Sequence, residues 1–213
     1  MSEPDFEFFV GGIEDGIIEL ATQLYGFRED NPNGYLKTID TYGGELDEKV
    51  LKEYIEQLTP MFPLKLVAYG DGGDKLAPAT SPAFNAPRRW RHDCTFSIIN
   101  CDDNARGEKE RRRGDGGYPG VIQMISDDRE ALAGRQLRKE GILLTFEPLR
   151  LAGVEFIARL PELTAYVQHF DTYFEWTEPD RRSETTPVEE LIFEVGSTGG
   201  LREPGKLPGV IVK

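Results

Sequence analysis

Residues 35–69, YLKTIDTYGGELDEKVLKEYIEQLTPMFPLKLVAY, contain the pattern that decides the fold. The stretch begins with β-branched and aromatic side chains, which favour a strand, and Gly43-Gly44 ends that strand. Apolar side chains then recur at helical spacing over residues 46–58, and Thr59-Pro60 ends the helix. Residues 64–69 are apolar enough for a central strand. This order predicts two parallel strands joined by a right-handed crossover.

The segments on either side of this unit extend it into a larger α+β domain. On the N-terminal side, apolar residues at helical spacing predict an amphipathic helix over residues 13–25. On the C-terminal side, residues 70–90 are rich in Gly, Pro and Ala and predict a long inserted loop. Alternating side chains then predict a strand over residues 90–101.

The second half of the chain predicts one more helix and several strands. The helix spans residues 121–137, and a strand over residues 142–151 is interrupted at Pro148. A short strand follows over residues 153–159, and the longest strand covers residues 163–176. Three aromatic side chains of the longest strand share one face and are predicted to be core residues: Tyr166, Phe170 and Phe174.

Together these elements predict a single α+β domain over residues 1–176. Its sheet is expected to be mixed and largely antiparallel, flanked by about three helices, with extended loops or arms. The inserted loop at residues 70–90 belongs to this domain. Residues 177–213, which are charged and rich in Gly and Pro, are expected to form a C-terminal extension or arm.

The composition is that of a soluble globular protein. The chain has 213 residues, of which 38% are hydrophobic and 30% charged, and its formal net charge is −13. Such an acidic balance disfavours general binding to the phosphate backbone of nucleic acids. No apolar run reaches the length of a transmembrane helix, and the N-terminus lacks the basic region of a signal peptide. Two cysteines do not make a disulfide scaffold.

Charge is unevenly distributed along the chain. Residues 1–60 carry 14 acidic and 4 basic side chains, whereas residues 88–113 carry 8 basic and 5 acidic side chains. The basic run from Lys109 to Arg113, within this segment, is interpreted in three ways: a solvated loop, a nucleic-acid patch, or a loop that meets an acidic neighbouring subunit. On the last interpretation, the candidate interface residues are Arg111, Arg112 and Arg113.

Motifs for catalysis, cofactors and metals are weak. Gly70-Asp71-Gly72-Gly73 lacks the Lys-Ser/Thr pair that holds phosphate in a nucleotide-binding loop. His92, Cys94 and Cys101 are three soft ligands, but the spacing of a zinc knuckle is absent. The chain contains one further histidine, His169. We therefore expect no catalytic, cofactor-binding or metal-binding residues and no enzymatic activity.

The segment Thr41-Tyr42-Gly43-Gly44-Glu45-Leu46-Asp47 resembles a block of the Mu-like phage tail terminator, or tail completion, proteins. These proteins are encoded between the head and tail genes. Leu58-Thr59-Pro60 and Val67-Ala68-Tyr69-Gly70 are similar to the next block of the family. The helix from Leu132 to Leu137 and the strand end Tyr173-Phe174-Glu175-Trp176 are similar to its C-terminal part. The resemblance covers residues 10–176.

The resemblance implies a structural virion protein located in the tail or neck and assembled in the host cytoplasm. It implies a homohexameric ring that caps the tail tube and joins it to the neck or head. The implied partners are the tail tube, the tail sheath and the neck or head-completion proteins, and DNA only passes through the lumen. No membrane, cofactor or catalytic residue is implied. The alternatives are a head-completion or neck connector protein and, third, a small cytoplasmic enzyme.

Overall fold

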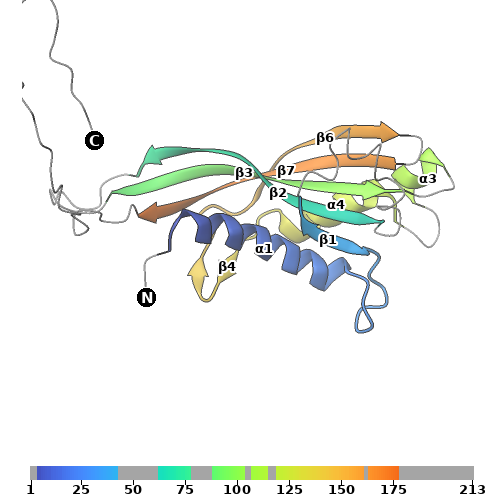
Figure 1. Cartoon of the computed structure of the whole chain (residues 1–213), viewed down its shortest axis with the longest axis horizontal. Helices are drawn as coiled ribbons and strands as arrows, with labels where there is room; N and C mark the ends of the chain where they lie inside the picture. The colour runs from blue at the N-terminus through green and yellow to red at the C-terminus, as the bar shows by residue number, and fades with distance from the viewer. Residues whose placement is uncertain are drawn as a thin grey trace, which may run out of the picture. The chain divides into compact units, whose positions relative to one another are not determined.

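The computed structural model describes residues 4–42, 62–77, 88–103, 107–114, 119–160 and 163–177 (Figure 1). The predicted helix at 46–58, residues 78–87 of the predicted loop at 70–90 and the predicted extension beyond residue 177 lie outside this range. The helices described are α1 (Phe6–Tyr25), α3 (Glu108–Arg113) and α4 (Val121–Leu132). The strands described are β1 (Thr38–Thr41), β2 (Leu64–Leu76), β3 (Arg89–Asp102), β4 (Arg138–Lys139), β5 (Ile142–Leu143), β6 (Arg150–Leu160) and β7 (Leu163–Thr177).

Five of the strands form one mixed sheet in the order β1-β2-β3-β7-β6. β1 pairs with β2 in parallel, as the pattern of residues 35–69 predicts, and the other pairings in this sheet are antiparallel. β4 and β5 form a separate two-stranded hairpin. The predicted α+β class with a mixed, largely antiparallel sheet is confirmed.

α1 forms because its sequence combines an N-cap with one continuous apolar face. The Asp5 side chain accepts a hydrogen bond from the Phe8 backbone N–H at 2.9 Å, which satisfies one of the free donors at the helix start. Phe9, Ile13 and Ile17 are buried against the sheet. The helix is longer than the predicted span of 13–25, because the apolar face begins upstream at the phenylalanines near residue 6.

The predicted loop at residues 70–90 is wrong over its first part, because β2 continues to Leu76. This half of β2 is exposed and carries no alternating apolar pattern, and its backbone pairs with β3. The register shifts between Tyr69 and Gly72, where a Cβ atom on Gly72 would lie 2.2 Å from the His92 Nε2 atom. Glycine therefore permits a close approach here that the sequence presents as a loop signal.

α4 is shorter than the predicted helix at 121–137. It ends at Leu132, since Ala133 adopts an extended conformation and Gly134 has a positive φ of 78°. Leu137 is nevertheless buried, because the chain turns back toward the core after the helix. The interruption predicted at Pro148 lies between β5 and β6.

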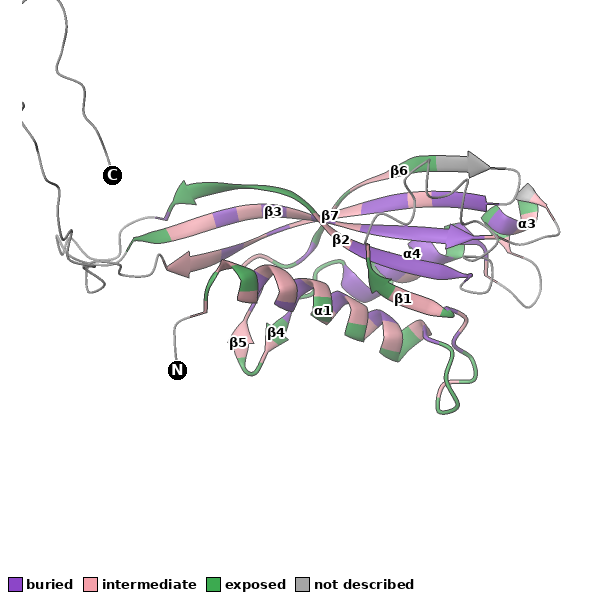
Figure 2. Ribbon diagram, in the orientation of Figure 1, coloured by how far each residue is buried: buried purple, intermediate pink, exposed green. Residues whose placement is uncertain are grey.

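Both faces of the sheet contribute to buried clusters. On one face, α1 and α4 cover Phe96, Ile98, Phe170 and Phe174. On the other face, a second cluster includes Phe62, Leu64, Leu66, Ile99, Cys101, Leu163, Ala165 and Val167. Figure 2 shows that buried residues dominate β2, β3 and β7 where they lie near α3 and α4. Phe170 and Phe174 are fully buried core residues as predicted, and Tyr166 is half-buried.

Polar contacts also hold α4 on the sheet. Lys65, Asn100 and Asp128 are buried and hydrogen-bonded to one another. The Tyr35 hydroxyl donates to Asp127 Oδ2 at 2.6 Å, and burial together with this carboxylate raises the pKa of Tyr35.

Among the described residues, no helix is both long and apolar enough to cross a membrane.

Candidate assembly surface

The candidate interface arginines lie on α3, a short helix within a stretch that the sequence predicts to be a polar loop. α3 contacts β7 and α4 at one end of the sheet (Figure 1). Gly114 follows the helix with a φ of 76°, and its N–H donates to the carbonyl of Glu110. Three arginines in the last turn complement the negative end of the helix dipole.

The helix turns the three arginines in different directions. Arg111 is only 6% exposed, and its Nε atom donates to Thr164 Oγ1 at 3.3 Å. Arg112 and Arg113 are exposed. Arg111 therefore anchors α3 to β7, and the other two arginines present the positive charge of the helix to solvent.

The carboxyl group of Asp103 interacts electrostatically with Arg111 at this end of the sheet. Burial raises the pKa of the Asp103 carboxyl, and a backbone hydrogen bond and the positive charges of Lys37 and Arg111 oppose that rise. The guanidinium of Arg111 thus stabilises a half-buried carboxylate as well as bonding to β7. The prediction of a polar loop does not distinguish the buried Arg111 from the exposed Arg112 and Arg113, because only the helical turn points these side chains in different directions.

The start of α4 packs tightly against the end of α3. A Cβ atom on Gly120 would lie 2.3 Å from the Gly114 backbone nitrogen and 2.7 Å from the Arg111 carbonyl oxygen. Real Cβ contacts are not this short, and backbone atoms yield less easily than flexible side chains. Glycine at position 120 therefore sets how closely α3 approaches α4.

We expect Gly120→Ala to displace α3 and to lower the free energy of unfolding by about 1–3 kcal/mol, as overpacking does elsewhere. Urea denaturation at pH 7 measures the loss. Gly153→Ala is the matched control, because no heavy atom lies within 4 Å of a Cβ built there. Equal stability of the two variants would contradict the close packing of α3 on α4.

The basic segment 88–113 does not form one surface. Arg89 and Arg91 lie at the start of β3 and α3 follows its end, so a 14-residue strand roughly 45 Å long separates the two groups. Arg89 pairs with Glu175 at 2.5 Å, and Arg91 pairs with Asp93 at 2.7 Å. The arginines at the start of β3 are therefore neutralised within the chain, and the exposed arginines of α3 are separate from them.

The described part of the acidic N-terminal region includes the outer face of α1. Glu7, Asp15 and Glu19 are exposed along this helix. Asp15 forms an ion pair with Lys139 at 3.0 Å. The acidic residues between 43 and 60 lie outside the described residues.

Large apolar side chains are exposed at several places, which include Leu76 on β2 and Ile122 on α4. On β6, which is an edge strand of the described sheet, Phe156 is 50% and Ile157 is 42% exposed. Near the end of α1, Leu24 and Phe27 are also exposed. Edge strands with exposed apolar side chains are typical places for association with another chain.

The two histidines occupy opposite faces of the sheet. His92 is buried, and its ring nitrogens contact Asp74 Oδ1 and the Tyr69 hydroxyl, each at 2.8 Å. His169 contacts the Ser97 hydroxyl at 3.0 Å on the other face. The two imidazoles therefore do not converge on a shared site.

The two cysteines also lie on opposite faces of the sheet and do not form a shared site. Cys94 belongs to the cluster beneath α1, whereas Cys101 belongs to the cluster on the opposite face. Burial raises the pKa of the Cys94 thiol to about 12 and raises that of Cys101 as well, which disfavours the thiolates that bind metals. Within the described ranges, no group of three or more His, Cys, Asp or Glu side chains is placed to hold a metal ion.

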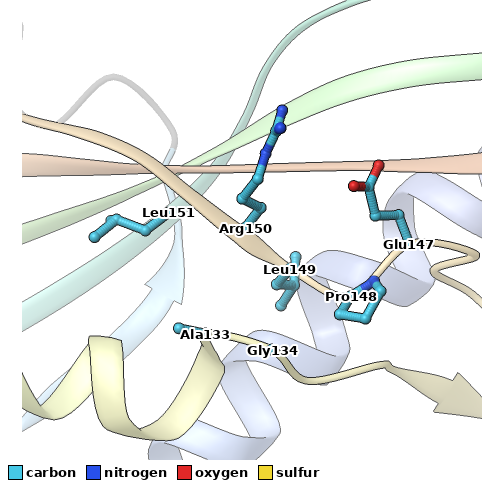
Figure 3. A pocket seen from close by; sticks show the side chains of 7 residues that line it. All are labelled: Ala133, Gly134, Glu147, Pro148, Leu149, Arg150 and Leu151. Carbon is cyan, nitrogen blue, oxygen red and sulfur yellow. The ribbon is translucent and has the colours of Figure 1, made fainter.

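A shallow pocket of about 360 Å³ lies between the end of α4 and the start of β6. It is lined by Ala133, Gly134, Glu147, Pro148, Leu149, Arg150 and Leu151. In Figure 3 the charged side chains of Glu147 and Arg150 point to one side, away from Ala133 and Gly134. Arg150 also contacts Asp171 at 3.4 Å, and the lining contains no Ser, Cys or His nucleophile.

Comparisons with known proteins give one family match. The family described as "Bacteriophage Mu, Gp37" matches residues 12–175, from α1 to β7. No curated protein matches significantly. Thirteen chains of solved structures match. One belongs to a structure titled "Virion of native gene transfer agent (GTA) particle", with 15% identity, a TM-score of 0.34, and coverage of 79% of this chain and 98% of that chain.

Proposed function

We propose that this chain, which belongs to the Bacteriophage Mu, Gp37 family, is a structural protein of a phage-like virion and acts as a tail terminator. The observation that carries the proposal is the family match, because it spans residues 12–175 and so includes most of the described elements. The match confirms that the chain is related to Mu-like phage proteins, as its sequence blocks indicate. In the proposed role, six copies form a ring that caps the tail tube and joins it to the neck or head.

The charges of the described residues support a repeated head-to-tail contact. A ring of identical subunits needs two different patches on each copy, which meet between neighbours. The exposed arginines of α3 and the exposed carboxylates of α1 have opposite charge and lie on different elements of the chain. Electrostatic complementarity of this kind directs association and sets its register.

The exposed apolar residues of β6 supply a second type of contact. Burial of Phe156 and Ile157 by a neighbouring subunit would remove apolar area from water, the main driving force for stable association. In the proposed virion, the remaining surfaces contact the tail tube, the sheath and the neck or head-completion proteins. An acidic lumen would let DNA pass without binding, since like charges repel.

The mass of the purified full chain by native mass spectrometry or light scattering tests the proposal. A sixfold assembly is the expected result. A twelvefold ring would instead favour a neck connector, and a monomer that turns over a substrate would favour an enzyme. Either of these two results would overturn the tail-terminator proposal.

We expect the double substitution Arg112→Glu and Arg113→Glu to weaken assembly at least about tenfold at low salt, and less at high salt, because exposed charges are screened. Arg135→Glu with Arg138→Glu is the matched control, since both residues are exposed and the change in net charge is the same. The subunit dissociation constant is measured by sedimentation. Equal constants for the two double variants would exclude α3 from the subunit interface.

A further inference from the structure

Three polar side chains meet in the interior between the sheet and α4. Lys65 on β2 and Asn100 on β3 are direct partners in the strand register, and α4 brings Asp128 against both. The Lys65 Nζ atom donates to Asn100 Oδ1 at 2.6 Å and also donates to Asp128 Oδ1. The Asn100 Nδ2 atom donates to Asp128 Oδ2 at 2.7 Å. Each of the three groups therefore contacts the other two.

This cluster is sealed from solvent. Lys65 and Asn100 are 0% exposed, and Asp128 is 1% exposed. Across the sheet, the same row continues with Ile39 on β1 and Tyr166 on β7. Burial of an ammonium group is costly even when it is paired, so a lysine at this position calls for an explanation beyond packing.

We propose that Lys65 and Asn100 form an intramolecular isopeptide bond and that Asp128 is the catalytic residue for its formation. The Cγ atom of Asn100 is bonded to Oδ1, so Lys65 Nζ lies within about 4 Å of the carbon that it would attack. Reacting atoms that are held in the right orientation about 3–3.5 Å apart react as if at very high concentration, and the Lys65 nitrogen needs only a small approach to Asn100 Cγ to reach this range. The fold itself thus supplies the orientation that the reaction needs.

In this reaction two protons pass from the Lys65 nitrogen to the Asn100 amide nitrogen, which leaves as ammonium. Asp128 accepts a proton from the Lys65 ammonium, and apolar surroundings assist this transfer because both products are neutral. The free amine attacks Asn100 Cγ, and the carbonyl becomes tetrahedral. Asp128 then returns its proton to the Asn100 Nδ2 atom, to which it is already hydrogen-bonded. The covalent Cγ–Nδ2 bond breaks. The new bond joins Nζ to Cγ, the displaced ammonia takes up the remaining amine proton and leaves as ammonium, and Asp128 is a carboxylate again.

The bond would have a defined mechanical effect. It would fix β2 to β3 between positions that are already register partners, so it would not distort the sheet. It would also close a covalent loop from residue 65 to residue 100, which limits the unfolded chain in the same way as a disulfide. The inference does not depend on the proposed tail-terminator role, because it rests only on the three buried side chains.

The intact mass of the purified, folded full chain tests the proposal. We expect a mass lower than the sequence mass by one ammonia molecule, and a branched peptide after digestion that joins the Lys65 and Asn100 segments. A folded chain with the full sequence mass would overturn the bond. Loss of one water molecule, with a Lys65–Asp128 branched peptide, would also overturn the assignment to Asn100.

Two variants make the assignment specific. Asn33 is exposed and is followed by Gly34, a sequence at which cyclisation to a succinimide would release the same ammonia. Asn33→Ala should therefore keep the mass loss, and Asn100→Ala, which retains the ion pair of Lys65 with Asp128, should abolish it. The opposite result would overturn the proposal.

The role of Asp128 has its own comparison. Asp128→Glu keeps a carboxyl group, whereas Asp128→Asn does not, and the yield of the branched peptide is measured for the soluble chains of each. We expect bond formation only in the carboxylate variant and in the wild type. Equal yields in both variants would exclude Asp128 as the catalytic residue, and the wild-type mass decides the bond itself even where a variant fails to fold.

Discussion

Asp128→Ala is expected to lower the free energy of unfolding by about 3–5 kcal/mol, the largest loss that we predict for a polar residue of this protein. Because this variant lacks the carboxyl group that the proposed isopeptide bond requires, its Lys65 ammonium would remain unreacted and buried without a carboxylate, and Asn100 would keep its Nδ2 atom but lose the acceptor for it. An uncompensated charge in the interior costs far more than an exposed one, because water cannot solvate it. Urea denaturation at pH 7 measures the loss.

The double variant Lys65→Met with Asp128→Leu is the control for this explanation. It removes both charges and fills the space with apolar side chains, so we expect it to recover at least half of the stability that Asp128→Ala loses. Asp15→Ala provides the exposed comparison, since its ion pair with Lys139 lies at the surface and should contribute less than about 1 kcal/mol. If Asp128→Ala were no more destabilising than Asp15→Ala, the buried cluster would not hold α4 on the sheet.

The sequence predicts those parts of the fold whose signal is local. α1, β3 and β7 are found because their apolar side chains repeat with the helix or strand period. The parallel pairing of β1 with β2 follows from the order of elements in residues 35–69. These predictions need no knowledge of which distant segments meet.

The missed features depend on contacts between distant segments. The exposed half of β2 is a strand because its backbone pairs with β3, although its glycines signal a loop. Lys65 lies in a short apolar run, and only the register places it opposite Asn100. Likewise, only the turn of α3 separates the buried Arg111 from the exposed Arg112 and Arg113. Periodicity along one segment contains none of this information.

Phe174→Ala is expected to lower the free energy of unfolding by about 3–5 kcal/mol, as removal of a fully buried phenylalanine does in other cores. Phe174 is 0% exposed and stacks on Phe9 of α1, with ring centroids 4.9 Å apart and an interplanar angle of 7°. It also contacts the rings of Phe6 and His92, at 5.7 and 5.1 Å. Alanine would leave a cavity at the point where the N-terminal turn of α1 rests on β7.

The matched control uses the same substitution at an exposed site. Phe27→Ala should change the stability by less than about 0.5 kcal/mol, because Phe27 is 64% exposed. If Phe174 holds α1 on the sheet, amide hydrogen exchange in the Phe174→Ala variant should increase most in the first turns of α1. Unchanged protection of these amides would contradict that role, because the stacked pair would then contribute packing energy without positioning the helix.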